Sequence, residues 1–127
     1  MVSMMHRIIS LFIFLNMSIS LSQADQIYDA CQLPETPAIP VGTVTEEQLL
    51  ASVSTVKSYQ IELGKFRTCL DQLKVPVDKN SMDEETVEKN KRVNAKLDSI
   101  YNISVEREQT VVDLLNKQIR LYKTNQE

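Results

Sequence analysis

The chain has two cysteines, Cys31 and Cys69, and their pairing is the most predictable chemistry in the sequence. Both follow an N-terminal segment that predicts export. In an oxidising compartment two cysteines most simply pair with each other. The bond would close a loop of about 38 residues, and the loss of chain entropy in the unfolded state then gives about 4 kcal/mol of stabilisation. The alternative is two free, reactive thiols.

Residue types that commonly perform catalysis are otherwise scarce. The single histidine, His6, lies in the segment that we expect to be removed. Without histidine the chain lacks Ser-His-Asp and Cys-His arrangements and the common zinc ligands. It also has no glycine-rich phosphate loop and no nucleophile elbow. We therefore predict that the protein is not an enzyme and has no cofactor or metal site.

Carboxylates are plentiful, but their spacing places them along helix faces. A pair for acid-base work needs two carboxyl groups that converge in a cleft, whereas a solvated helix surface explains these positions more simply. They are Asp83, Glu84, Glu85, Glu88, Glu106 and Glu108.

Glu108 is the one acidic residue on the inner line of the second predicted helix. It could be a buried carboxylate with a raised pKa, or a ligand for a cation. The simpler interpretation places it at the edge of the apolar stripe, or pairs it with an arginine such as Arg67 on the other helix. We favour this second interpretation.

Residues 1–24 are typical of a secretory signal peptide. His6 and Arg7 precede an apolar run over residues 8–21, and small residues occupy the −3 and −1 positions of a cleavage site at Ala24. A membrane anchor is the alternative, but the run of about 14 residues is shorter than the ~20 that span a bilayer. Cys31 lies well beyond the apolar run, which argues against a lipoprotein. The expected locations are the periplasm or, alternatively, the extracellular space, with no stable membrane insertion after cleavage.

The remaining residues 25–127 carry 13 basic and 17 acidic side chains, so their net charge is −4. A nucleic-acid-binding protein would show a basic stripe instead. We therefore expect no nucleic-acid partner.

Residues 25–44 form an irregular, proline-rich arm. Prolines at every third position prevent a regular helix and favour an extended polyproline II conformation. Such a segment could dock in an aromatic groove of another protein. However, the 14 residues from Cys31 to Thr45 span roughly 43 Å when extended, and the 24 residues from Thr45 to Cys69 span roughly 36 Å as helix. An arm that turns at Gly42 would bring the cysteines together, so we favour a strap. The three prolines are Pro34, Pro37 and Pro40.

Two long helices are predicted, over residues 45–74 and 82–123. Thr45 and Gln48 form a capping box at the first start, and Ser81 with Glu84 indicates another at the second. Pro76 ends the first helix. Apolar residues recur at steps of three and four, so each stripe faces one partner. The predicted fold is all-α: an antiparallel, coiled-coil-like two-helix hairpin over residues 45–124, with an extended proline-rich N-terminal arm pinned by a disulfide.

The two helices differ in predicted length. At 1.5 Å per residue they span roughly 43 and 63 Å, so the second should overhang by about 20 Å at its C-terminal end. Uncovered apolar surface usually meets another protein, and a homodimer in a four-helix arrangement would cover it. We predict an interaction surface for a second copy or for another envelope protein at Leu114, Leu115, Ile119, Leu121 and Tyr122.

The sequence resembles an uncharacterised family of small exported proteins of proteobacteria. The residues that carry the resemblance are Cys31, Pro34, Pro37, Ile39, Pro40, Gly42, Val56, Lys57, Tyr59, Cys69, Leu70, Tyr101, Asn102, Val105, Asn116, Ile119, Arg120, Tyr122 and Lys123. Val41 departs from the family pattern, which has a polar residue before the glycine. The resemblance implies a two-helix architecture and a Gram-negative periplasm, and it brings no known activity.

These observations predict a non-enzymatic exported helical protein with a structural or protein-interaction role. The alternatives are a periplasmic module that binds a small ligand or metal ion through Glu108 and its neighbours, or a chaperone-like envelope protein.

Overall fold

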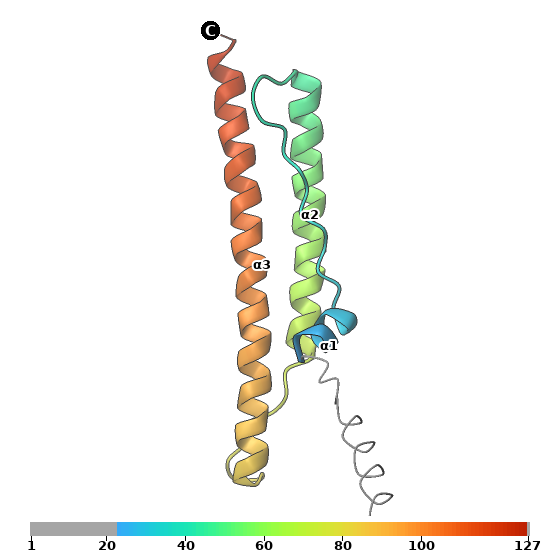
Figure 1. Cartoon of the computed structure of the whole chain (residues 1–127), viewed down its shortest axis with the longest axis vertical. Coiled ribbons are helices and arrows are strands. Elements are labelled where there is room, and N and C mark those ends of the chain that lie inside the picture. The colour runs from blue at the N-terminus through green and yellow to red at the C-terminus, as the bar shows by residue number, and fades with distance from the viewer. Residues whose placement is uncertain (1–22, 127) are drawn as a thin grey trace, which may run out of the picture.

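The computed structural model describes residues 23–126, so almost all of the predicted signal peptide, residues 1–24, lies outside the described residues. The elements are α1 (Gln23–Ala30), α2 (Glu46–Gln72) and α3 (Glu84–Thr124). The two long helices lie antiparallel and side by side (Figure 1). Within residues 23–126 no helix combines the length and the apolar character that a membrane span requires. The prediction of an all-α fold with two packed long helices is confirmed.

α2 begins with the predicted capping box. The Thr45 hydroxyl accepts a hydrogen bond from the Gln48 N–H (3.2 Å), and the Gln48 side chain accepts one from the Thr45 N–H (2.9 Å). Glu46 and Glu47 lie in the first turn, where the helix dipole favours negative charge. The capping box and the acidic first turn are both local features, so the sequence alone determines where α2 begins.

The predicted cap of α3 at Ser81 is wrong. Asp83 is the N-cap residue, and its carboxylate accepts a hydrogen bond from the Thr86 N–H (2.9 Å). The Ser81 hydroxyl instead donates to the Asp78 carboxylate (2.7 Å) within the loop. Hydrogen bonds from the Thr86 side chain and backbone hold the pKa of Asp83 below its ordinary value. An anion at a helix N-terminus is favourable, so the helix begins two residues later than the serine pattern indicated.

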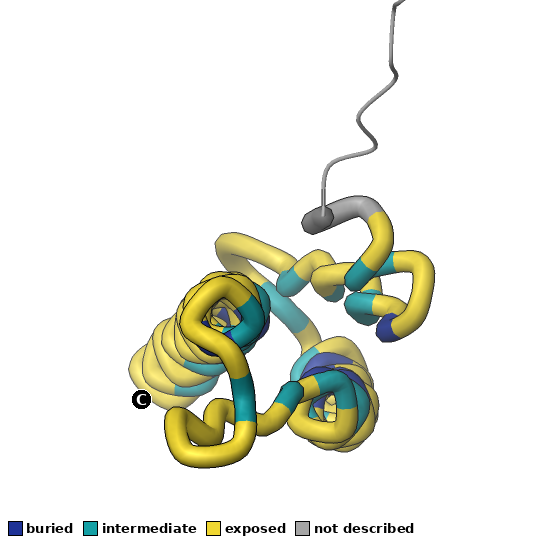
Figure 2. Tube along the Cα trace, turned by 90° about the horizontal axis from the view of Figure 1, so that it is seen from below, coloured by how far each residue is buried: buried dark blue, intermediate teal, exposed yellow. Residues whose placement is uncertain are grey.

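The buried residues of α2 and α3 face each other along one seam, and the outward sides of the helices are exposed (Figure 2). Their steps of three and four residues are those of a coiled coil. They form two cores, which we name by their position in Figure 1. The lower core consists of Cys31, Phe66, Leu70, Leu97 and Ile100. The upper core consists of Val56, Tyr59, Leu63, Val111 and Leu115.

Residues 31–45 contain no helix or strand and run back along α2 towards its first turn (Figure 1). Leu33 packs against both cores, and Ile39 packs against the upper core. Near the upper end, the Gln118 side chain donates a hydrogen bond to the Gly42 carbonyl (2.7 Å). Gly42 has φ +87°, a conformation that glycine adopts without steric cost.

The prediction that residues 25–44 are wholly irregular is wrong for the residues of α1. Ile27 and Tyr28 pack against the lower core, and the Tyr28 ring stacks on Phe66 with ring centroids 6.5 Å apart. The first proline after α1 is Pro34, so none interrupts this short helix. Burial of two apolar side chains explains why a helix forms there.

Most of the extra length of α3 lies at its N-terminal end, and not at the predicted C-terminal end (Figure 1). There it runs beside the α2–α3 connection. Asn94 exchanges two hydrogen bonds with the backbone of Val75 (3.0 and 2.8 Å), and Asn90 donates one to the Pro76 carbonyl (2.8 Å). Asn90 and Asn94 therefore hold the connection against the first turns of α3.

Candidate functional site

The predicted disulfide between Cys31 and Cys69 is present, with Cα atoms 5.7 Å apart. Cys31 is fully buried in the lower core, and Cys69 is half-buried. The bond joins the start of the arm to the last turn of α2. Because it uses both cysteines of the chain, the alternative of two free thiols is wrong in this structure.

A polar layer of four side chains crosses the seam, and on α3 it separates the two cores. The Arg67 guanidinium forms an ion pair with the Glu108 carboxylate at 2.7 Å, and Gln60 donates a hydrogen bond to the same carboxylate at 2.9 Å. Arg67 also donates to the hydroxyl of the fully buried Ser104 (2.9 Å), which donates to the Tyr101 carbonyl (2.6 Å). The Arg67 guanidinium lies 5.6 Å from the centre of the Tyr101 ring. We call Gln60, Arg67, Ser104 and Glu108 the polar layer.

The predicted pairing of Glu108 with Arg67 is confirmed, and the alternative of a raised pKa is wrong. Burial is the largest single influence and raises the pKa of Glu108. The hydrogen bonds from Arg67 and Gln60, together with the positive charge of Arg67, outweigh it, so the pKa is lowered. Glu108 is therefore an ionised carboxylate at neutral pH, and both of its oxygens already have partners. In residues 23–126 no three His, Cys, Asp or Glu side chains lie close enough together to hold a metal ion.

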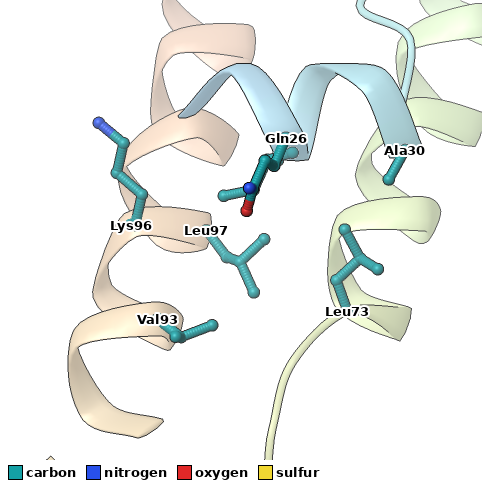
Figure 3. A pocket seen from close by; sticks show the side chains of 7 residues that line it. Gln26, Ala30, Leu73, Val93, Lys96 and Leu97 are labelled. Atoms are coloured by element: carbon teal, nitrogen blue, oxygen red, sulfur yellow. The ribbon is translucent and has the colours of Figure 1, made fainter. Parts of the chain in front are cut away.

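A small apolar cleft lies at the lower end of the molecule, between α1, the end of α2 and the first half of α3 (Figure 3). Its volume is about 250 Å³. The Gln26 amide lies above Leu97, whereas the Lys96 ammonium points away from the cleft (Figure 3). The cleft could hold one apolar group without a charged partner inside it. Its other lining residues are Ile27, Ala30, Leu73 and Val93.

The predicted C-terminal interaction surface is divided by the seam. Leu115 belongs to the upper core, Ile119 packs against it, and Tyr122 is half-buried. Leu114 and Leu121 are 42% and 40% exposed. They are seven residues apart, so they lie on one side of α3.

Sequence reasoning did not identify Ile103 as part of this surface. It is 38% exposed and lies eleven residues before Leu114, which is three helical turns, so it continues the same line. The spacing of eleven and seven residues between Ile103, Leu114 and Leu121 could have identified it, because this spacing places them on one side of a helix. We call Ile103, Leu114 and Leu121 the exposed apolar line.

Comparison of the chain with protein-family models, curated proteins and solved structures found no match.

Proposed function

We propose that this is a non-enzymatic exported protein whose role is to bind another protein through α3. The observation that carries the proposal is the exposed apolar line. Its three side chains stay accessible to solvent although the two cores below are closed. Aligned apolar side chains on a surface favour contact with another protein. The charged pair of the seam, Arg67 and Glu108, is held by an ion pair and by hydrogen bonds from Gln60 and to Ser104, which gives no support to a catalytic role.

We further propose that the proline-rich segment acts as a strap on a coiled-coil-like hairpin. The disulfide, Leu33 and Ile39 support this role. Prolines restrict the unfolded chain, so the segment loses less entropy when it orders. The arm covers one side of the groove, and the exposed apolar line of α3 stays accessible to solvent.

The periplasm is the compartment that we propose. The disulfide is compatible with an oxidising compartment. The predicted signal peptide and the resemblance to small exported proteins of proteobacteria point the same way.

Association tests the main proposal. We expect Leu114→Gln with Leu121→Gln to weaken association of the exported protein, because these side chains face solvent and changing them leaves the cores intact. The matched control is Asn116→Gln with Lys117→Gln, two exposed neighbours on the same helix. Light scattering at high micromolar concentration measures self-association, and native capture from the cell envelope measures other partners. A monomer without co-purifying protein, or equal association of both variants, would contradict the proposal.

The cleft beside α1 supports a second candidate function, the binding of a small apolar ligand. Ala30→Phe would fill the cleft, and Ala95→Phe, at an exposed position of α3, is the control. A thermal-shift screen with short-chain fatty acids and divalent cations tests ligand binding and so separates this function from protein binding through α3. Stabilisation by a fatty acid in the control and its loss in Ala30→Phe would favour this second function, and no shift with any compound would leave only the first.

A further inference from the structure

The N-terminal segment, residues 23–41, is attached to the hairpin by side chains and one covalent bond. The contacts are the Tyr28–Phe66 stack, the packing of Leu33 and Ile39, and the disulfide. Within the described part of the chain, the backbone N–H groups of residues 32–41 make no hydrogen bond to the hairpin. No β-ladder ties the segment to its own molecule. Any identical groove offers the same set of contacts.

The turn that reverses the chain between the segment and α2 is weakly secured. It depends on Gly42, the one residue of positive φ in the described range, and on a single hydrogen bond from Gln118. Val41 in this turn is 83% exposed. Among residues 23–126, the turn is thus the one place where the closed arrangement needs a positive φ.

We propose that two copies of this chain exchange their N-terminal segments. Each segment would occupy the groove of the other hairpin and keep all its contacts, including those of α1. Only the backbone around Gly42 would change, from a reversed turn to an extended link. Exchange of an identical element is a low-cost route to a dimer, because the contacts of the exchanged segment are made again in the partner.

The geometry fixes how the two copies meet. The turn lies at the end of the molecule that carries the first turn of α2 and the C-terminus of α3 (Figure 1). Extended links at this end join two hairpins end to end into an elongated dimer. Val41 in the turn and Leu121 in the last turn of α3 are exposed at this end, so the junction gives them apolar surface to contact. The inference deepens the proposed function, on which it rests, by naming a second copy as the partner.

The covalent step needs no net oxidant. A low-molecular-weight thiolate attacks one sulfur of the Cys31–Cys69 bond, forms a mixed disulfide and releases the other cysteine as a thiolate. That thiolate attacks the corresponding disulfide of the second chain, and a final exchange returns the small thiol. Two disulfides within chains thereby become two disulfides between chains, and the number of thiols is unchanged.

Isotope mixing tests the exchange. Equal amounts of ¹⁵N-labelled and unlabelled exported protein are refolded together at high micromolar concentration in a glutathione buffer. Non-reducing electrophoresis isolates the dimer, and mass spectrometry of its peptides identifies the linked cysteines. We expect Cys31 of one isotope bonded to Cys69 of the other. Absence of a linked dimer, or a dimer linked only through Cys31–Cys31 and Cys69–Cys69 bonds, would overturn the proposal.

Two glycine variants provide the matched comparison. Gly42→Ala strains the closed turn at φ +87°, so we expect the dimerisation constant to rise about fivefold or more. Gly64→Ala has open space around the added Cβ and an ordinary helical backbone, so the constant should stay unchanged. An equal response of both variants would also overturn arm exchange. Association through the exposed apolar line alone would respond to Leu114→Gln with Leu121→Gln but not to Gly42→Ala, which separates the two proposals.

Discussion

The lower and upper cores lie in the same groove between the same two helices, but they are closed in different ways. A disulfide and α1 close the lower core, whereas Ile39 and one hydrogen bond from Gln118 to Gly42 close the upper end. The covalent end fixes where the arm begins. The other end depends on packing that can form and break. One groove therefore combines a covalent attachment with a non-covalent one, and the polar layer separates the two on α3.

Removal of the disulfide should have the largest effect on stability, because this covalent bond closes the lower core and has no counterpart in the upper core. We expect Cys31→Ser with Cys69→Ser to lower the free energy of unfolding by about 2–4 kcal/mol, since the unfolded chain regains the entropy of a long closed loop. Denaturant unfolding measures the loss. The parent protein in reductant is the control and should match the variant. An unchanged melting temperature under oxidising conditions would contradict the strap interpretation.

Two matched leucines test whether the cores are separate units. Leu63 belongs to the upper core and Leu70 to the lower core, and both are fully buried, so replacement of either by alanine should cost about 3 kcal/mol. Combined with Cys31→Ser and Cys69→Ser, Leu63→Ala should give an additive loss, because it does not belong to the cluster that contains Cys31. Leu70 belongs to the cluster that contains Cys31. The combined loss for Leu70→Ala and the cysteine changes should therefore differ from the sum of the separate losses by at least about 0.5 kcal/mol. Equal coupling at both positions would show that the cores behave as one.

A change in the polar layer should have the smallest effect on stability. Glu108→Gln removes the charge that faces Arg67 and should lower the free energy of unfolding by about 1 kcal/mol at neutral pH. The pKa of Glu108 is lowered in the folded protein, so its contribution is complete above the ordinary value of 4.5 and is lost as the pH falls through the folded value. The difference between parent and variant should therefore shrink in acid.

Glu62→Gln is the control for this effect. Glu62 pairs with Lys65 on the exposed surface of α2, where an ion pair contributes less than about 0.5 kcal/mol. A pH profile of the Glu108→Gln difference that is flat down to pH 3 would contradict the role of its charge.

The sequence predicted local features well because their causes lie within a few residues. The Thr45 capping box and the stepped apolar lines depend on neighbours in the chain. The disulfide followed from the cysteine count and from the lengths of the arm and helix. The pairing of Arg67 with Glu108 followed from one acidic residue on an apolar line.

Features that depend on distant partners were missed. Gln118 is buried because it reaches the Gly42 carbonyl, 76 positions away in the chain. The end at which α3 extends further depends on how the connection packs, through Asn90 and Asn94. Helix lengths alone do not decide at which end the longer helix extends. We predicted an overhang at the C-terminal end of α3, and this was wrong. The same error led us to expect Leu115, Ile119 and Tyr122 on an exposed surface, whereas they face the groove.

The disulfide also makes the chain from Cys31 to Cys69 a closed covalent ring, with α3 attached to it by a single stretch of backbone. A protease that cuts one bond in the exposed arm opens the ring but releases no fragment, and the two pieces separate only after reduction. A cut between Gln72 and Glu84 removes the covalent link between α3 and the ring, and both cores contain residues of α3. A nick in the arm therefore leaves its two pieces covalently joined, whereas the α2–α3 connection is the single covalent link between the two long helices.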